Sequence, residues 1–183
     1  MYHSGLPMLL RIFVVVLALI ACVLLFAATK PSTFQIERSI TISAPPAKVF
    51  ALIDDFHNWP QWAPQDRDDP AMRRTYSGAN AGTGAVCDWT GKKGSTGAGR
   101  MTITQDAANS KVTVEADWRK PFPVRNTNEF TLTPAGQGTQ LTWSITGTNL
   151  YMMKVMEVFV GVHGLMGSHL DTGLDNLKNV AEQ

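Results

Sequence analysis

The chain has 183 residues, of which 44% are hydrophobic and 17% charged, so it can form one packed domain with an appendage. Sixteen basic and 15 acidic residues leave a net charge of +1. No basic run is arranged to neutralise a row of phosphates, which disfavours nucleic-acid binding. The two cysteines, Cys22 and Cys87, belong to no Cys/His cluster, so a structural zinc site has no support.

The N-terminal region is dominated by an apolar segment, residues 8–28, which only Arg11 interrupts. Its uninterrupted part, residues 12–28, is about 17 residues long, close to the lower limit for a membrane-spanning helix. Residues 8–10 extend it, because the long side chain of Arg11 can reach the lipid head groups. We therefore predict a single-pass membrane anchor within residues 1–30.

Two other interpretations of this segment stay open. A cleaved signal peptide would have the same charged start and apolar core, although no A-x-A site follows. A lipoprotein signal would use Cys22, which follows Leu19-Ile20-Ala21, although a further apolar run comes after the cysteine. If the segment is an anchor, we expect the short N-terminus inside the cell and the long domain that follows outside the cytoplasm.

Residues 31–183 are predicted to form one domain of the α+β class. Seven short segments alternate apolar and polar residues or are bounded by turn residues, which is typical of antiparallel strands. These segments are residues 34–42, 72–76, 85–90, 100–105, 112–118, 128–132 and 141–145. A short helix is predicted from Pro46 to the break at His57-Asn58-Trp59-Pro60.

The C-terminal region changes to a helical period. From His163 onward, four apolar residues fall on one face of a helix of about 18–20 residues; they are Met166, Leu170, Leu174 and Leu177. Gly173 lies near this stripe and would permit a close approach to the sheet. A shorter helix is predicted over residues 151–160, ended by Gly161. A strongly curved antiparallel sheet of about seven strands around the long helix fits this order of elements. The space left between sheet and helix would be an apolar cavity.

Several sequence segments occur in a recognisable order. Ser43-Ala44-Pro45-Pro46-Ala47-Lys48-Val49-Phe50 follows the first predicted strand, and Trp59-Pro60-Gln61-Trp62-Ala63-Pro64 follows the first helix. The series continues with Gly82-Thr83-Gly84, Trp89-Thr90-Gly91, Gly99-Arg100-Met101-Thr102-Ile103, Lys120-Pro121-Phe122, Asn128-Glu129-Phe130, Gly138-Thr139-Gln140-Leu141-Thr142-Trp143 and Gly173-Leu174-Asp175-Asn176-Leu177-Lys178. The ordered set, over residues 34–182, resembles the START-like (SRPBCC, helix-grip) superfamily, in its polyketide cyclase/dehydrase branch. The resemblance implies a helix-grip fold with a ligand cavity, but no activity and no catalytic pattern.

Aromatic, methionine and other side chains at inward-facing positions are candidates for the wall of this cavity. They are Trp89, Met101, Trp118, Phe122, Asn128, Phe130, Trp143, Met152, Phe159, Met166 and Leu170. Ordinary core packing is the alternative role for each. Asn126, Asn128 and Arg125 could orient a polar ligand group if they face inward. The segment Gly94-Ser95-Thr96-Gly97-Ala98-Gly99 precedes no helical pattern, so we interpret it as a loop without a phosphate-binding role.

We expect a domain that binds a small hydrophobic molecule, such as a lipid, an isoprenoid or an aromatic metabolite, near the membrane. An enzyme of cyclase, dehydrase or hydrolase type is the alternative, and it would need a titratable group inside the cavity. The candidates are Asp88, Glu115, Asp117, His163 and His169, although the strand pattern places the three carboxylates on the solvent face. A third hypothesis is an interaction protein with an exposed apolar patch. The sequence suggests no cofactor and no metal, and it names no protein partner.

Overall fold

A computed structural model describes residues 8–94 and 96–183 of the chain. The chain divides into two compact units. The first combines residues up to 32 with residues 149–162, and the second combines residues 33–148 with residues 163–183. The short segment between the last strand and the final helix therefore groups with the N-terminal helix.

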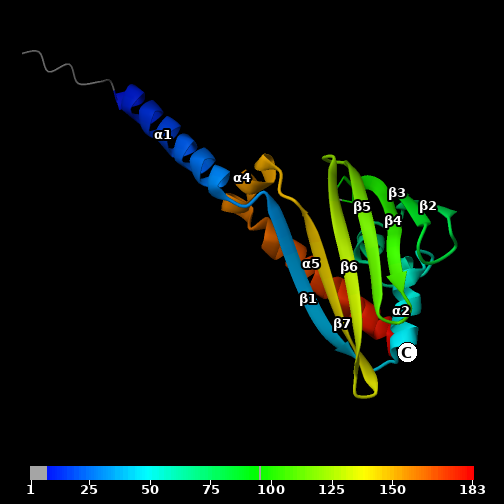
Figure 1. The fold of residues 1–183 in the computed structure, drawn as a ribbon. Helices are drawn as coiled ribbons and strands as arrows, with labels where there is room; N and C mark the ends of the chain where they lie inside the picture. Colours follow the sequence, from blue (N-terminus) through cyan, green and yellow to red (C-terminus); the bar gives the residue numbers. More distant parts are fainter. Residues whose placement is uncertain (1–7, 95) are drawn as a thin grey trace, which may run out of the picture. The chain divides into compact units, whose positions relative to one another are not determined.

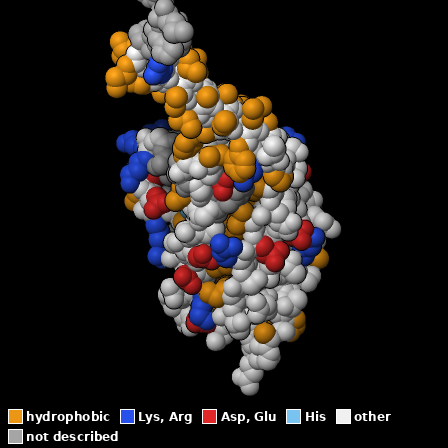
Figure 2. All heavy atoms as spheres, turned by 90° about the vertical axis from the view of Figure 1, so that its left-hand side faces the viewer, with side chains coloured by type: hydrophobic (Ala, Val, Ile, Leu, Met, Phe, Trp, Pro, Cys, Tyr) orange, Lys and Arg blue, Asp and Glu red, His pale blue; other side chains and the backbone are white. Residues whose placement is uncertain are grey.

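The first unit consists of two helices, α1 (Met8–Thr29) and α4 (Tyr151–Val160). Among the described residues, α1 is the one helix with the length and apolar composition of a membrane span. Figure 2 shows hydrophobic side chains along its whole length. The predicted shorter helix is confirmed as α4, and it ends at Gly161, whose left-handed backbone (φ 62°) closes the last turn.

The second unit is built on one seven-stranded antiparallel sheet, as predicted. The strands are β1 (Thr33–Ile42), β2 (Arg73–Gly78), β3 (Ala85–Thr90), β4 (Ala98–Ala107), β5 (Lys111–Lys120), β6 (Val124–Ala135) and β7 (Gly138–Thr148). Their order in the sheet is β1-β7-β6-β5-β4-β3-β2, so β1 closes onto the last strand while β2 forms the far edge (Figure 1).

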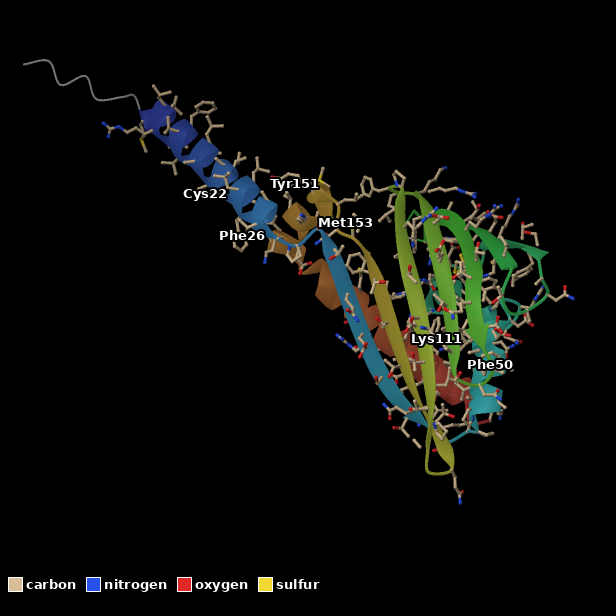
Figure 3. All side chains as sticks on the ribbon, in the orientation of Figure 1. Cys22, Phe26, Phe50, Lys111, Tyr151 and Met153 are labelled. Atoms are coloured by element: carbon tan, nitrogen blue, oxygen red, sulfur yellow. The ribbon has the colours of Figure 1, made fainter. Side chains whose placement is uncertain are left out.

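Strict alternation of side chains gives the sheet an inner face, which is packed, and an outer face, which meets solvent. The inner-face core includes Ile36, Val114, Phe130 and Leu141, all of which are buried. Charged residues line the outer face. For example, Lys111, labelled in Figure 3, pairs with Glu129 on the neighbouring strand at 2.7 Å.

The long C-terminal helix, α5 (Val162–Ala181), covers part of the inner face. It buries the predicted apolar stripe, including Leu170, Leu174 and Leu177. The predicted close approach at Gly173 is confirmed, because a Cβ atom there would lie 2.6 Å from the Trp143 ring and 3.4 Å from Pro64.

Three short helices between β1 and β2 cover another part of the inner face. They are α2 (Pro46–Asp54), η1 (Trp59–Gln61) and α3 (Pro64–Asp68), and each has proline in its first turn, where the missing N–H is tolerated. The α2 helix packs across β5, β6 and β7, and Phe50, labelled in Figure 3, is half-buried against the core. Asn176 of α5 donates to the Trp62 carbonyl at 3.1 Å, which ties α5 to this segment.

Candidate ligand-binding site

One row of inner-face residues crosses the sheet at the level of Asn126. The register places Asn126 opposite Ala116, Ala116 opposite Met101, and Met101 opposite Cys87. Ala116 and Cys87 are buried, whereas Asn126 and Met101 keep partial exposure. The small Ala116 lies between two longer side chains. The row therefore has an amide group on one side of Ala116 and a thioether on the other.

The adjacent row contains a buried amide with specific partners. The Asn128 side chain is 9% exposed. Its Nδ2 donates to Asn126 Oδ1 at 2.9 Å, and its Oδ1 accepts from Trp143 Nε1 at 3.1 Å. The inward orientation considered for Asn126 and Asn128 is therefore correct. Arg125 points outward instead, where it pairs with Asp117.

Aromatic rings fill the inner face beyond this amide. Phe130 stacks on Trp143 with ring centroids 5.0 Å apart, and Trp62 meets both rings edge-on. Trp59 packs against Trp62 and donates its indole N–H to the Ile53 carbonyl at 2.8 Å. Of the predicted wall residues, Phe130, Trp143 and Leu170 thus belong to a tightly packed cluster.

Other predicted wall residues keep partial exposure. Met101 and Met166 are half-buried, and both pack against the core. Trp118 is half-buried beside the buried Trp89, and the two rings meet edge-on with centroids 5.0 Å apart. The Trp89 indole N–H donates to the Thr96 carbonyl at 3.1 Å. Apolar surface at these positions is therefore only partly covered by the protein itself.

Three predicted wall residues do not lie in the interior. Phe122, Met152 and Phe159 are 56%, 62% and 70% exposed. Phe122 belongs to the turn between β5 and β6, and the other two belong to α4, which packs against α1. Helical spacing and residue type alone could not distinguish these exposed positions from core positions.

The strand carboxylates lie on the outer face, as their parity predicts. Asp88 accepts from Arg100 at 2.8 Å and pairs with Arg119 at 3.2 Å, and these contacts, led by the Arg100 hydrogen bond, lower the pKa of Asp88. Asp117 pairs with Arg125. Asp88 and Asp117 therefore lie away from the inner face, where an acid or base for a bound molecule would have to be.

His169 is the predicted titratable residue that turns inward. It lies on α5 between the buried residues Gly167 and Leu170 and is half-buried. Burial lowers the pKa of His169 below its ordinary value, and the nearby Asp68 carboxylate partly opposes this effect. Its ring is thus neutral at physiological pH. The side chain of His163 lies outside the described part of the chain.

A buried ion pair was not anticipated from the sequence. Arg74 of β2 binds Asp66 of α3 through two nitrogen atoms, with Nε 3.0 Å from Oδ1, and its Nη1 lies 3.4 Å from the Cys87 sulfur. Burial raises the pKa of the Cys87 thiol, so this cysteine is unreactive. The available signal was the inward parity that Arg74 shares with Tyr76 in the predicted strand of residues 72–76.

The glycine-rich segment, residues 94–99, folds around a carboxylate and not around a phosphate. Asp69 Oδ2 accepts from the backbone N–H groups of Lys92 and Lys93 at 2.7 and 2.8 Å and from the Thr96 hydroxyl at 2.7 Å. The predicted loop is confirmed at Gly94, Thr96 and Gly97, whereas Ala98 and Gly99 already belong to β4; Ser95 lies outside the described residues.

A seven-stranded antiparallel sheet that wraps a long C-terminal helix defines the helix-grip class of α+β domains. A family model described as "Polyketide cyclase / dehydrase and lipid transport" matches residues 33–182. The chain therefore belongs to this family of the SRPBCC superfamily, as its sequence resemblance implied. A search of curated proteins gives no match.

Several solved structures share the fold at low sequence identity. A protein from Chromobacterium violaceum is 16% identical, with a TM-score of 0.57 over 84% of this chain and 99% of its own. Ara h 8.0201 is 16% identical, with a TM-score of 0.58 over 81% and 97%. The di-domain ARO/CYC StfQ from the steffimycin biosynthetic pathway is 14% identical, with a TM-score of 0.64 over 82% of this chain and 51% of its own. At these identities the likeness concerns the fold alone.

Proposed function

We propose that this protein is a membrane-tethered binding domain that takes up a small hydrophobic molecule on the inner face of its sheet. The observation that carries the proposal is the row of Asn126, Ala116 and Met101, in which a half-buried amide and a half-buried thioether flank the small, buried Ala116. Sites for small molecules typically combine mostly apolar walls with a few fixed polar groups. The family description, which includes lipid transport, supports this class of ligand.

The polar part of the proposed site is preorganised. Asn128 holds the Asn126 carbonyl oxygen through its amide N–H, and Trp143 in turn holds Asn128. This chain of hydrogen bonds fixes the orientation of the Asn126 amide before any ligand arrives. A fixed amide in the same inner-face row as Met101 would orient a ligand that carries one polar group on an apolar body, such as a lipid or an isoprenoid.

The alternative function is catalysis by His169. A half-buried neutral imidazole on the helix that covers the inner face is a suitable general base. None of the described residues forms a hydrogen bond or ion pair that orients the His169 ring. An acid–base pair would also need an inward-facing carboxylate, and the described strand residues offer none. Binding without turnover is therefore the stronger proposal.

The test is mass spectrometry of the full chain released from membranes in mild detergent, followed by organic extraction. Two variants of adjacent β6 residues form a matched pair: Asn126→Trp fills the inner face, and Thr127→Trp places the same ring on the outer face. We expect an apolar compound with the wild type and with Thr127→Trp, and its loss from Asn126→Trp.

The same spectrum tests the tether. An intact N-terminus in the membrane fraction supports the anchor, whereas a chain shortened within residues 1–30 would replace it with a cleaved signal. Equal amounts of apolar compound in both tryptophan variants, or none in the wild type, would contradict binding at the inner face. Conversion of the bound compound by the wild type and not by His169→Gln would favour the enzyme.

A further inference from the structure

The α4 helix exposes an apolar stripe that no described residue covers. Met152, Met156 and Phe159 are 62%, 42% and 70% exposed. Their spacing of four and three residues places them on one side of the helix. The positions between them are half-buried. A methionine and phenylalanine stripe of this kind is unfavourable in water and indicates a contact surface.

The start of α4 is fastened to the end of α1. The Tyr151 hydroxyl donates to the Leu24 carbonyl at 2.8 Å, and Lys154 Nζ donates to the Lys30 carbonyl at 2.9 Å. Figure 3 labels Tyr151 and Met153 beside Phe26, near this end of α1. One side of the last turns of α1 is covered accordingly, since Ala27 is fully buried and Val23 half-buried, while the other residues of the helix are exposed.

The attachment point has a definite depth if α1 spans a bilayer. The 22 residues of α1 extend over about 33 Å, close to the ~30 Å of a hydrocarbon core. Leu24 lies five residues before the last residue of α1, which corresponds to about 7.5 Å of helix. Helices that lie in the membrane interface bury their apolar side by roughly 5–10 Å. The contact between Tyr151 and Leu24 therefore holds α4 at the depth of the interface.

The chemistry of the attached residues agrees with this depth. Tyrosine is enriched at the membrane interface, where its ring meets apolar groups and its hydroxyl meets polar ones. Lysine places its charge at the boundary while its stem remains in apolar surroundings. Tyr151 and Lys154 both bind main-chain carbonyls near the end of the span.

We propose that α4 is an interfacial helix, and that Met152, Met156 and Phe159 contact the acyl chains of the bilayer beside the anchor. The occupant of the stripe is lipid, because α4 is fastened to the end of α1, whose apolar side chains are themselves exposed. The proposal rests on the proposed anchoring of α1 and adds a second membrane contact from a segment about 120 residues further along the chain. The tether is then a pair of helices, in which α4 limits the rotation of α1.

The test uses spin labels on the full chain in phosphatidylcholine vesicles. Single cysteines are introduced as Met156→Cys and Phe159→Cys in a Cys22→Ala background; the remaining Cys87 is fully buried, and the unlabelled background sets the baseline. Leu17→Cys, exposed on α1, reports the lipid phase, and Gln137→Cys, exposed in the turn between β6 and β7, reports water. Collisions with oxygen, which concentrates in lipid, are compared with collisions with a water-soluble nickel chelate.

We expect labels at positions 156 and 159 to lose collisions with the nickel chelate relative to position 137, and to gain oxygen collisions towards the value at position 17. If the labels at positions 156 and 159 collide with the nickel chelate as often as the label at position 137, α4 is not an interfacial helix. A lipid-exposed label at position 17 in the same experiment would show that the anchor itself still holds. Protection from both reagents would show that a protein or a second copy covers the stripe, which also overturns the proposal. A water-exposed position 17 would refute the anchor itself.

Discussion

Three glycines of α5 provide a graded test of how closely this helix approaches the sheet. At Gly173 an added Cβ would lie 2.6 Å from a carbon of the Trp143 ring. That ring cannot move away, because its indole N–H is bonded to Asn128 and its face is stacked on Phe130. Overpacking of this kind costs about 1–3 kcal/mol. Alanine recovers about 1 kcal/mol of helix propensity, so Gly173→Ala should lose up to about 2 kcal/mol of stability.

The other two glycines separate this steric effect from helix propensity. At Gly164 no atom lies within 4 Å of the added Cβ, so alanine should gain up to about 1 kcal/mol. At Gly167 the Cβ would meet the end of the Arg38 side chain at 2.3 Å. The guanidinium can swing away and give up its exposed pair with Asp171, which is worth at most about 1 kcal/mol. Gly167→Ala should therefore be close to neutral.

Thermal unfolding of the full chain in mild detergent, followed by tryptophan fluorescence, measures this series. About 2–4 °C per kcal/mol is expected for a protein of this size. The predicted order of melting temperatures is Gly164→Ala highest, wild type and Gly167→Ala together, and Gly173→Ala lowest. A melting temperature of Gly173→Ala at or above that of Gly164→Ala would refute the rigid contact between α5 and Trp143.

Three further predictions concern buried polar groups. Asn128→Leu leaves the Trp143 indole N–H without its acceptor and should cost about 1–3 kcal/mol in urea unfolding. Asp66→Ala leaves the largely buried Arg74 guanidinium without its carboxylate partner and should cost about 3–5 kcal/mol; the double variant with Arg74→Met should cost less than Asp66→Ala alone. Burial lowers the pKa of His169 in the folded chain, so as the pH falls the unfolded chain takes up a proton at His169 before the folded chain does. Stability should therefore fall as the pH drops below about 6.5. His169→Gln should flatten this pH dependence.

The sequence predicts the fold well because alternation on strands and the stripe on α5 both reflect one buried face. All seven strands and the C-terminal helix lie where the periodicity places them, although most strands run longer; β6, for instance, covers Val124–Ala135 in place of residues 128–132. The ends of strands are missed because residues there, such as Arg125 at the start of β6, pair with partners on the outer face and carry no apolar signal.

The candidate site is less predictable, since it depends on which side chains remain uncovered. Phe130 and Met101 look alike as inward strand residues, yet Phe130 is sealed by Trp62 and Trp143 while Met101 is half-buried. Met152 on α4 was predicted to line the interior, but it is exposed in the unit that contains α1. Contacts between different elements decide these cases, and local spacing does not report them.

The proposed tether would change what the proposed site must achieve. An apolar ligand that starts in water gains about 25 cal/mol per Å² on burial, but one that starts in lipid is already removed from water and gains little. Selective uptake from the membrane must then come from polar contacts, and the fixed amide of Asn126 is the group that the inner face offers.

This reasoning makes a prediction about transfer from lipid. Asn126→Leu removes the amide at nearly constant volume and should weaken uptake from vesicles about fivefold, the equivalent of one hydrogen bond of about 1 kcal/mol. Met101→Leu, across the same row, exchanges one apolar side chain for another and should leave this transfer nearly unchanged. Partition of the co-purified compound between vesicles and the full chain measures both. If Met101→Leu had the larger effect, the fit of apolar surfaces would govern selection, and the amide would serve only to hold the sheet together.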